Sequence, residues 1–359
     1  MEDSKALDIK RYDSSADKSL RPHSAADEYL LRHYNNLTIT PERLTIYNDR
    51  FGYLSCHLNK HSPTTILTHK SQEKAIHLNL QANKLPLAQF STPLSVQKNE
   101  IDYAIMKAPK SLELFHFFLE HIVHNSTDDV TIVVAFMTRH FSPKLLSISE
   151  TYFQGVDQSK AIKKSRLLTL NKKRKVDKLN AINIINYNNQ EYKQYWGVFS
   201  SQHIDYATQF FLEYLELDSE CKRVLDLASG NGIIAKTIEQ KLPNSEIHLL
   251  DDSFLAVESS KLNINGKNIH HHYSNDLSDF EENTFDLIVT NPPFHFEYEV
   301  NIQITLKLFI ECFRCLKSGG NLQIVASRHL NYMTHLKPLF QEVNIIAKND
   351  KFIIYKCMK

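Results

Sequence analysis

The residues best suited to chemistry are Asn291, Pro292, Pro293 and Phe294, which follow the apolar run 285–289. α/β folds keep their ligands at the carboxyl ends of such strands. An amine on an aromatic ring is a weak nucleophile, and the Asn291 Oδ1 and the Pro292 carbonyl would draw it toward sp³ geometry and stabilise its developing positive charge. Proline fixes φ and so aims that carbonyl, while Phe294 would stack on a base turned out of a nucleic acid. The segment therefore predicts group transfer to a planar nitrogen.

A glycine-rich turn lies upstream, with Ala228, Gly230 and Gly232 between the apolar run 223–228 and the helical pattern 233–241. Glycine has no Cβ and the amides at a helix N-terminus are unpaired, so a small polar ligand can approach the backbone closely. The same spacing satisfies the fingerprint of dinucleotide-binding loops. The turn alone leaves both NAD and S-adenosylmethionine open as cofactors.

Two carboxylates lie near this turn, and one of them, Asp226, favours S-adenosylmethionine. Asp226 precedes Gly230 by four residues, where an anion would attract the amino group of the sulfonium ligand and repel a diphosphate. Asp251 follows the strand 247–250 and would accept hydrogen bonds from both ribose hydroxyls, as it would in NAD. The neighbouring Asp252 is expected to cap the next helix. Asp226 therefore decides between the two cofactors.

Further polar residues fall near the same expected edge of the sheet. Asn275 and Asp276 come after the next strand and could reach the adenine amine, although a polar turn explains them almost as well. Arg328 and His329 follow the strand 322–326 and could contact the substrate.

We expect no metal ion. His270, His271 and His272 are of a metal-ligand type, but three consecutive residues cannot all face one ion. Cys312 and Cys315 form a lone C-x-x-C without a second pair, so they are expected to pack a helix. Five scattered cysteines are typical of a protein whose thiols stay reduced.

The elements that hold these residues alternate between strand and helix from residue 191 onward, which is typical of a parallel sheet covered by helices on both faces. The predicted strands are 223–228, 246–250, 285–289, 322–326 and 352–355. The predicted helices are 233–241, 254–263 and 304–316, with Gly319 and Gly320 ending the last one.

The first half of the chain repeats this plan more faintly. Strands are predicted at 44–47, 65–67, 102–106 and 130–135, and a helix at 73–83. Offsets between the halves are similar: 177 from Asp49 to Asp226, 182 from Ser71 to Ser253 and 184 from Pro109 to Pro293. We therefore predict a duplicated domain whose first copy has lost its site residues.

The predicted fold class is α/β, with two tandem Rossmann-like domains of which the first is degenerate and the second catalytic. A chain of 359 residues suits two cores better than one. The expected boundaries are an N-terminal extension at 1–40, the degenerate domain at 41–165, a basic linker at 166–190 and the catalytic domain at 191–359.

Charge is divided between the halves, although the formal net charge is +1. Residues 1–200 carry 27 Lys+Arg against 20 Asp+Glu, which is +7, and residues 201–359 carry 15 against 21, which is −6. The densest basic run, Lys160 to Lys178, suits either a solvated linker or a surface that contacts phosphates. The chain has no apolar stretch of about 18 residues and no secretory signal, so a cytoplasmic protein without membrane contact is expected.

At these residues the sequence resembles the ribosomal RNA guanine-N2 methyltransferases, most closely those that act on 23S RNA. The resemblance extends from Leu44 to Lys359 and is strongest in these segments: Gly197-Val198-Phe199-Ser200, Asn291-Pro292-Pro293-Phe294-His295, Arg314-Cys315-Leu316-Lys317, Ile324-Val325-Ala326, Arg328-His329-Leu330 and Lys351-Phe352. One departure is Ala228-Ser229, where the family usually has Gly-Cys. Alanine leaves cofactor approach open unless its position needs a positive φ.

The resemblance implies two tandem methyltransferase-like domains, the first of which lacks the cofactor loop and helps to hold RNA. It implies S-adenosylmethionine as donor, with contacts from Asp226, Gly230, Gly232 and Asp251, and catalysis by residues 291–294. The segment 197–200, including Phe199, would cover the cofactor together with Asp205. The implied reaction is methylation of guanine N2 in 23S rRNA that carries little or no protein.

Three alternatives stay open. Sister enzymes acting on 16S rRNA share the tetrapeptide. The tetrapeptide also serves adenine N6, cytosine N4 and the side-chain amide of glutamine, all planar nitrogens, so protein-glutamine methylation is the main enzymatic alternative. A non-enzymatic RNA-binding or assembly factor with a decayed site is the third, and the intact Asp226, Asp251 and Asn291 argue against it.

Overall fold

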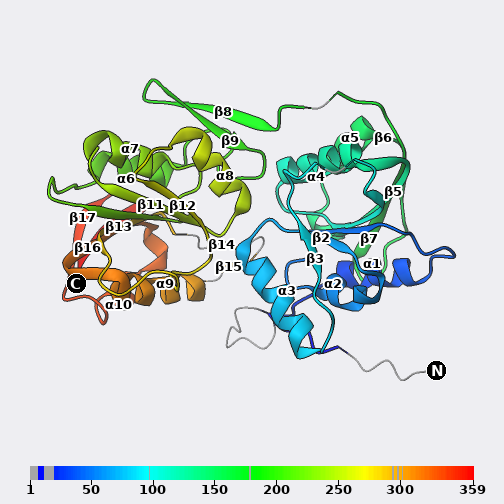
Figure 1. The fold of residues 1–359 in the computed structure, drawn as a ribbon, viewed down its shortest axis with the longest axis horizontal. Helices are drawn as coiled ribbons and strands as arrows, with labels where there is room; N and C mark the ends of the chain where they lie inside the picture. Colours follow the sequence, from blue (N-terminus) through cyan, green and yellow to red (C-terminus); the bar gives the residue numbers. More distant parts are fainter. Residues whose placement is uncertain are drawn as a thin grey trace. The chain divides into compact units, whose positions relative to one another are not determined.

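The computed structural model describes residues 7–11, 20–96, 98–177, 179–292, 295–296, 299–300 and 302–359. The chain forms two compact units, residues 1–181 and 182–359 (Figure 1). Each unit contains a seven-stranded sheet. None of the helices formed by the described residues is long and apolar enough to cross a membrane.

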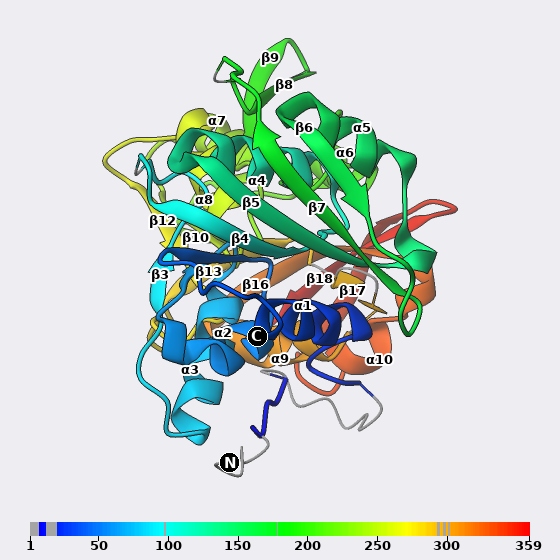
Figure 2. The same cartoon turned by 90° about the vertical axis from the view of Figure 1, so that its right-hand side faces the viewer.

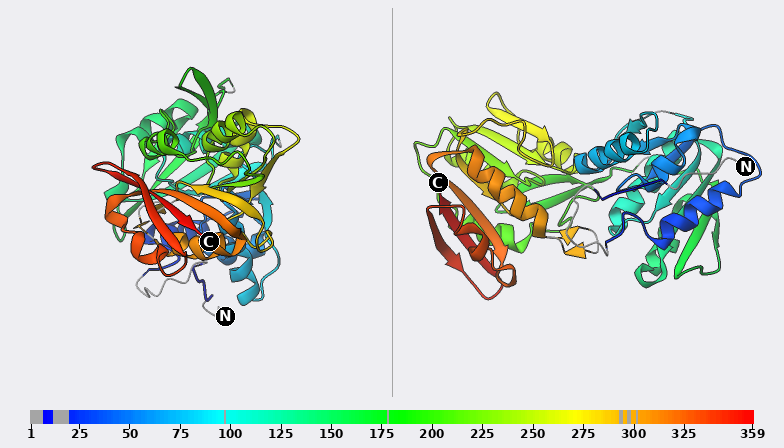
Figure 3. Two further views of the ribbon diagram at one scale, coloured as in Figure 1. Left: turned by 90° about the vertical axis from the view of Figure 1, so that its left-hand side faces the viewer. Right: turned by 90° about the horizontal axis from the view of Figure 1, so that it is seen from below.

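The second unit is built on a sheet of strand order β12-β11-β10-β13-β16-β18-β17. These strands are β10 (Arg223–Leu227), β11 (Glu246–Asp251), β12 (Ile269–Tyr273), β13 (Phe285–Thr290), β16 (Leu316–Ser327), β17 (Glu342–Lys348) and β18 (Phe352–Met358). The first five strands in this order run parallel, whereas β18 is antiparallel to both β16 and β17. The sheet is thus mixed, not wholly parallel as predicted, and its last two strands are the red ones in Figure 3.

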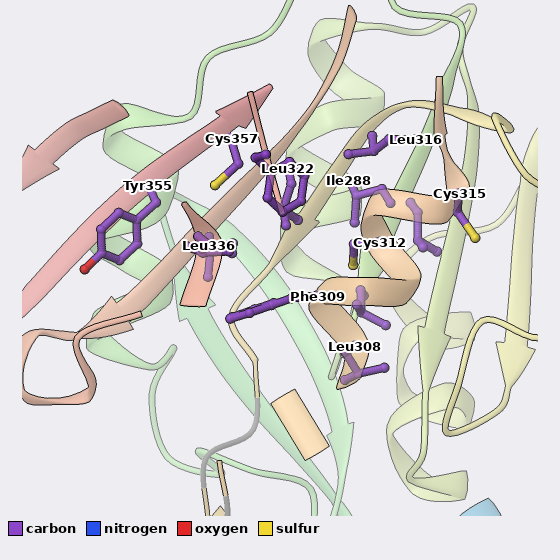
Figure 4. Close-up of a cluster of buried hydrophobic side chains, with 14 of the residues drawn as sticks. Ile288, Leu308, Phe309, Cys312, Cys315, Leu316, Leu322, Leu336, Tyr355 and Cys357 are labelled. Carbon is purple, nitrogen blue, oxygen red and sulfur yellow. The ribbon is translucent and has the colours of Figure 1, made fainter. Parts of the chain in front are cut away.

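Helices cover both faces of this sheet, because successive side chains of a strand point to opposite faces. The remaining elements of the unit are α6 (Tyr206–Tyr214), α7 (Ile233–Lys241), α8 (Phe254–Asn263), α9 (Ile302–Cys315), α10 (Met333–Leu336) and the hairpins β8 (Ile182–Tyr187) with β9 (Gln190–Tyr195) and β14 (His295–Phe296) with β15 (Glu299–Val300). Val224 packs with α6 and α7, and its neighbour Leu225 packs with α9. Cys312 and Cys315 are free thiols buried in the α9 core, as predicted (Figure 4).

The first unit has the strand order β3-β2-β1-β4-β5-β7-β6. Its strands are β1 (Leu44–Tyr47), β2 (Thr64–Ile66), β3 (Gln89–Ser91), β4 (Ile101–Lys107), β5 (Ser126–Met137), β6 (Phe153–Gln158) and β7 (Ser165–Lys173). Its helices are α1 (Ala25–Asn35), α2 (Tyr53–His57), α3 (Lys70–Ala82), α4 (Leu112–Asn125) and α5 (Pro143–Tyr152). α4 and α5 cover one face and α1 and α2 the other (Figure 2).

The two sheets correspond strand by strand, which confirms the predicted pair of Rossmann-like domains. The turn after the first strand also repeats at a constant offset of 180. Asn48 and Ala228 have φ values of 57° and 59°, and Gly52 and Gly232 have values of 80° and 82°. Each glycine is the N-cap of the following helix.

The predicted offset of 177 between Asp49 and Asp226 is wrong, because at an offset of 180 Asp49 corresponds to Ser229. The two aspartates look equivalent because both accept a hydrogen bond from the third residue of the next helix. Asp49 Oδ2 accepts from Ser55 N at 2.7 Å, and Asp226 Oδ2 accepts from Ala235 N at 2.9 Å. Asp49 bonds to α2 from the turn that follows β1, whereas Asp226 bonds to α7 from within β10.

The predicted offset of 182 from Ser71 to Ser253 is also wrong. The helices α3 and α8 follow the N-caps His69 and Ser253, which differ by 184. The register gives the same 184 between β4 and β13, since Met106 and Thr290 lie opposite the last residues of β1 and β10.

Several predicted boundaries of domains and helices differ from those in the structure. The supposed extension at 1–40 contains α1, whose apolar side chains pack in the core of the first unit. The supposed linker at 166–190 begins with most of β7, which pairs with β5 and β6, and ends with the hairpin of the second unit. The helix α9 ends at Cys315, so Gly319 and Gly320 lie within β16 and do not end the helix.

Candidate functional site

The turn after β10 forms an open cradle at the carboxyl edge of the second sheet. An added Cβ at Gly230, whose φ is +56°, would meet nothing within 4 Å. Gly232 has a φ of +82°, and a Cβ there would lie 3.1 Å from Ser260 Cβ. Gly232 therefore allows close packing of α7 on the sheet, while Gly230 leaves space for a ligand.

Asp226 is a fully buried carboxylate beneath this turn. Its Oδ2 accepts a hydrogen bond from Ala235 N at 2.9 Å, whereas its buried Oδ1 has no hydrogen-bond partner among the described residues. Burial raises the pKa of Asp226 to about 7, because the charged form is poorly solvated. A cationic group near Oδ1 would favour the ionised form.

Asp251 stands at the end of β11 and ties the turn to the neighbouring strand. Its Oδ2 accepts from Gly230 N at 2.9 Å, and its Oδ1 accepts from Ser253 N at 2.8 Å. Burial raises its pKa to about 6. Each carboxylate oxygen keeps a second lone pair, so both can still accept from ribose hydroxyls. The N-cap of α8 is Ser253, and the predicted cap at Asp252 is wrong.

The residues after β12 lie beside Asp251, since Ser274 N donates to the Asp251 carbonyl at 3.2 Å. Asp276 Oδ1 accepts from the backbone amide and the hydroxyl of Ser278, which forms a polar turn. Asn275 is half-buried in the same turn. Contact of Asn275 and Asp276 with adenine stays a prediction.

Asn291 follows β13, and its carboxamide is oriented by the N-cap of α6, Asp205, and by Thr208 in its first turn. Its Nδ2 donates to Asp205 Oδ2 at 2.9 Å and to Thr208 Oγ1 at 3.0 Å. A carboxylate can only accept hydrogen bonds, so the nitrogen must face Asp205. Asn291 Oδ1 therefore points away from α6, and none of the described residues donates to it.

Asp205 also caps α6, accepting from Ala207 N at 3.1 Å and Thr208 N at 3.2 Å. The sequence assigned Asp205 only to a cover over the cofactor, and its bond to Asn291 was not foreseen. Pro292 is buried next to Asn291. The predicted residues Pro293 and Phe294 lie outside the described residues, so their roles stay predictions.

The segment 197–200 is tied to the glycine-rich turn by Gln194, a buried residue that sequence reasoning missed. Gln194 Nε2 donates to the carbonyls of Val198 and Phe199, each at 3.1 Å. Its Oε1 accepts from Asn231 Nδ2 at 3.0 Å. Phe199 is 74% exposed, so a large apolar side chain stands free beside the turn. This arrangement supports the predicted cover.

These residues fit S-adenosylmethionine. The buried Oδ1 of Asp226 suits an ammonium group, Asp251 suits a ribose, and the space at Gly230 admits a ligand against the backbone. A diphosphate would bring negative charge toward the buried Asp226, which disfavours NAD, whereas Asp251 suits the ribose of either cofactor.

The corresponding positions of the first unit do not fit this ligand. At the offsets of 180 and 184 established by the turns and strand registers, Arg50 replaces Gly230, Leu67 replaces Asp251 and Lys107 replaces Asn291. Lys107 Nζ lies 3.3 Å from Oδ2 of the buried Asp27. The first unit therefore keeps the scaffold and lacks the site.

A hollow of about 550 Å³ opens where β16 ends and β18 begins, at the same edge of the second sheet. Its lining is formed by Ser327, Arg328, His329, Asp350, Lys351 and Phe352. Arg328 is anchored there by a bond from Nη1 to the Asn349 carbonyl at 3.2 Å. Its lining carries both basic and acidic side chains, and substrate contact by Arg328 and His329 stays a prediction.

Comparison with known proteins agrees with this geometry. Two family models match, the RLMG N-terminal domain over residues 1–174 and the methyltransferase small domain over residues 189–356. The ribosomal RNA large subunit methyltransferase G of Vibrio vulnificus is 30% identical over 368 residues, covering 98% of this chain and 97% of the relative. Its namesake from Photobacterium profundum is 28% identical, covering 99% and 98%.

A solved structure resembles the chain in fold. It is the T. thermophilus 16S rRNA N2 guanine methyltransferase RsmC in complex with AdoMet and guanosine, with a TM-score of 0.76. The sequences are 18% identical, and the match covers 94% of this chain and 92% of that one.

We predict that Ala228→Gly stabilises the second unit. Ala228 has a φ of +59°, and a left-handed alanine costs on the order of 1 kcal/mol that glycine does not incur. The melting temperature should rise by roughly 2–4 °C, measured by calorimetry, and the affinity for S-adenosylmethionine should not fall.

Ala82→Gly is the matched control, because Ala82 is exposed in the last turn of α3 with an ordinary helical backbone. It should lower stability by up to about 1 kcal/mol. If both changes moved stability in the same direction, backbone strain at Ala228 would not be the cause.

Proposed function

The chain belongs to the family of ribosomal RNA large subunit methyltransferase G, and from this we propose that its second unit methylates guanine N2 in 23S rRNA. It is an S-adenosylmethionine-dependent methyltransferase. The observation that carries the proposal is the Asn291 carboxamide, whose nitrogen is held by Asp205 and whose oxygen is left to accept from a substrate amine.

S-adenosylmethionine would supply a methyl group on a positively charged sulfur; the leaving group would be a neutral thioether, and the proton lost by the methylated amine would pass to water. Asn291 Oδ1 accepts a hydrogen bond from the exocyclic amine and stabilises the positive charge that develops there. The Pro292 carbonyl is the second acceptor. Because the displacement needs no strong base, the main task of these residues is to hold the nitrogen in line with the methyl group.

The methyl donor is held by residues in and around the glycine-rich turn after β10. Asp226 binds the amino group of the donor, and Asp251 accepts from its ribose. Asn275 and Asp276 contact the adenine, and Phe199 closes over the turn from its anchor on Gln194. Phe294 stacks on the extruded guanine.

Family membership favours rRNA over protein glutamine as the substrate, and the large-subunit name of the relatives favours 23S over 16S RNA. The fold is shared with an enzyme that acts on 16S rRNA, so the fold does not decide between the two RNAs. The intact site at Asp226, Asp251 and Asn291 disfavours a non-enzymatic assembly factor.

The first unit holds RNA, with part of the basic run Lys160–Lys178 as its contact surface. Lys173 serves the fold instead, since its Nζ donates to the Ser126 carbonyl at 3.0 Å. Lys163 is paired with Glu28 at 2.9 Å. Lys164, Lys172 and Lys175 are exposed and carry the charge that suits phosphates.

The first test is methylation in vitro of protein-free 23S rRNA from cells that lack the enzyme, with mapping of the modified nucleotide. We expect N2-methylguanine in 23S rRNA and little product with 16S rRNA or a glutamine peptide. Asn291→Ala should lower kcat by at least about 100-fold, with S-adenosylmethionine affinity nearly unchanged, because the lost acceptor serves only the substrate. Preferred labelling of the peptide, or equal loss of activity and donor binding, would contradict the proposal.

Asp205→Ser tests the orientation of Asn291. Serine still caps α6 but is too short to reach Asn291, so the carboxamide is free to turn. We expect kcat to fall roughly 10- to 100-fold while the KM for S-adenosylmethionine and the melting temperature change little. A stable variant with normal kcat would show that Asp205 acts only as a helix cap.

Lys164, Lys172 and Lys175 are replaced together by glutamine. A plot of the logarithm of the 23S rRNA binding constant against the logarithm of salt concentration has a negative slope, and we expect its magnitude to decrease by about 2. The control replaces the exposed Lys60, Lys84 and Lys110, which changes the net charge of the same unit equally. Equal slopes in the two triple variants would remove the basic run from the RNA interface.

A further inference from the structure

Strands β11 and β12 bring three histidines and a glutamate to one face of the second sheet. Parallel pairing puts His248 opposite His270, and Glu246 and His272 lie two residues from them on the same face. His271 points to the other face, where its Nδ1 bonds to a serine of α8 at 2.8 Å. The three consecutive histidines therefore do not share one face. His270 and His272 lie beside Glu246 and His248 of β11, whereas His271 faces α8.

The distances within this group are close to those of a metal site. Glu246 Oε1 lies 3.1 Å from His248 Nε2 and 3.4 Å from His270 Nε2. A tetrahedral ion with bonds of about 2.0–2.1 Å separates neighbouring ligands by about 3.3 Å. All three ligand atoms lie within 4.8 Å of one another, so a small rotation of the His270 ring completes the triangle.

The surroundings supply the hydrogen bonds that metal ligands need. His248 Nδ1 lies 2.9 Å from His272 Nε2, so a proton on Nδ1 leaves the Nε2 lone pair directed at the proposed ion. Arg223 is bidentate on Glu246, donating from Nε to Oε2 at 2.7 Å and from Nη2 to Oε1 at 3.2 Å, so its positive charge competes with the proposed ion for the Oε1 that also faces the histidines. The side chains of Glu246 and His270 are 33% and 41% exposed, so water can reach the remaining ligand position.

We propose that Glu246, His248 and His270 bind one divalent transition-metal ion of the Zn²⁺ class, with His272 orienting His248. This departs from the expectation of no metal, which considered only neighbours in sequence. His248 lies three residues before Asp251, a separation of about 10 Å along the strand, so the ion is structural and distinct from the methyl-transfer site. It joins the edge strand β12 to β11.

The test uses the full chain, purified without a polyhistidine tag and freed of metal by a chelator. Titration with Zn²⁺ in a calorimeter and with Co²⁺ by absorption should each give one saturable site per chain, and Zn²⁺ should raise the melting temperature. His270→Gln, at a half-exposed position, should weaken binding at least about 10-fold. His335→Gln is the control, because His335 is exposed on α10, outside the cluster.

Arg223→Gln distinguishes an ion site from an ordinary hydrogen-bonded cluster. Removing the positive charge beside Glu246 should tighten Zn²⁺ binding several-fold, opposite in sign to His270→Gln. Absence of a saturable site in the folded wild-type chain, or binding that is unaffected by His270→Gln, overturns the proposal. Neither outcome would bear on methyl transfer.

Discussion

The site depends on the hydrogen bond between the Asp205 carboxylate, which can only accept, and the Asn291 carboxamide, which can both donate and accept. Asp205 Oδ2 must take the amide hydrogens of Asn291, so the carboxamide has one orientation before any substrate arrives. The same carboxylate caps α6, which follows the segment anchored by Gln194 to the glycine-rich turn. Asp205 therefore links Asn291, the proposed substrate acceptor, to the helix that follows the proposed cover over the donor.

The two units show how little of a Rossmann-like scaffold the chemistry occupies. Both keep the strand order and both keep a left-handed residue and a left-handed glycine in the first turn. The difference lies in the side chains at the carboxyl edge. Arg50 fills the place of Gly230, and Lys107 is paired with buried Asp27 where the second unit has Asn291. The ion pair occupies Lys107 and satisfies the charge of the buried Asp27, so the first unit has no carboxamide acceptor at this position.

Local patterns allowed the sequence to predict the central elements and part of the site. Helices 233–241 and 254–263 and strand 44–47 have the predicted bounds, because apolar runs and turn residues delimit them. A strand was expected before Asn275 without bounds, and most of the basic strand β7 was assigned to a linker, since neither β12 nor β7 is a continuous apolar run. Asp226, the glycine turn and Asn291 lie at recognisable spacings. The sequence could not predict that Asp205 bonds to Asn291 or that Gln194 bonds to Asn231, because these pairs are 86 and 37 residues apart in the chain.

The buried Asp226 lowers the stability of the fold, and this loss is explained if its carboxylate has a function. Its pKa of about 7 in the folded chain lies well above the unfolded value of about 3.8. A raised carboxyl pKa destabilises the fold increasingly as pH rises from about 4 to 7, where the cost is on the order of 4 kcal/mol. An apolar residue in the same strand would avoid this cost, although it would leave Ala235 N without its acceptor. The carboxylate makes physical sense when a cation lies against its Oδ1, because the attraction then offsets the desolvation, and binding of the amino group of the donor becomes linked to release of a proton from Asp226.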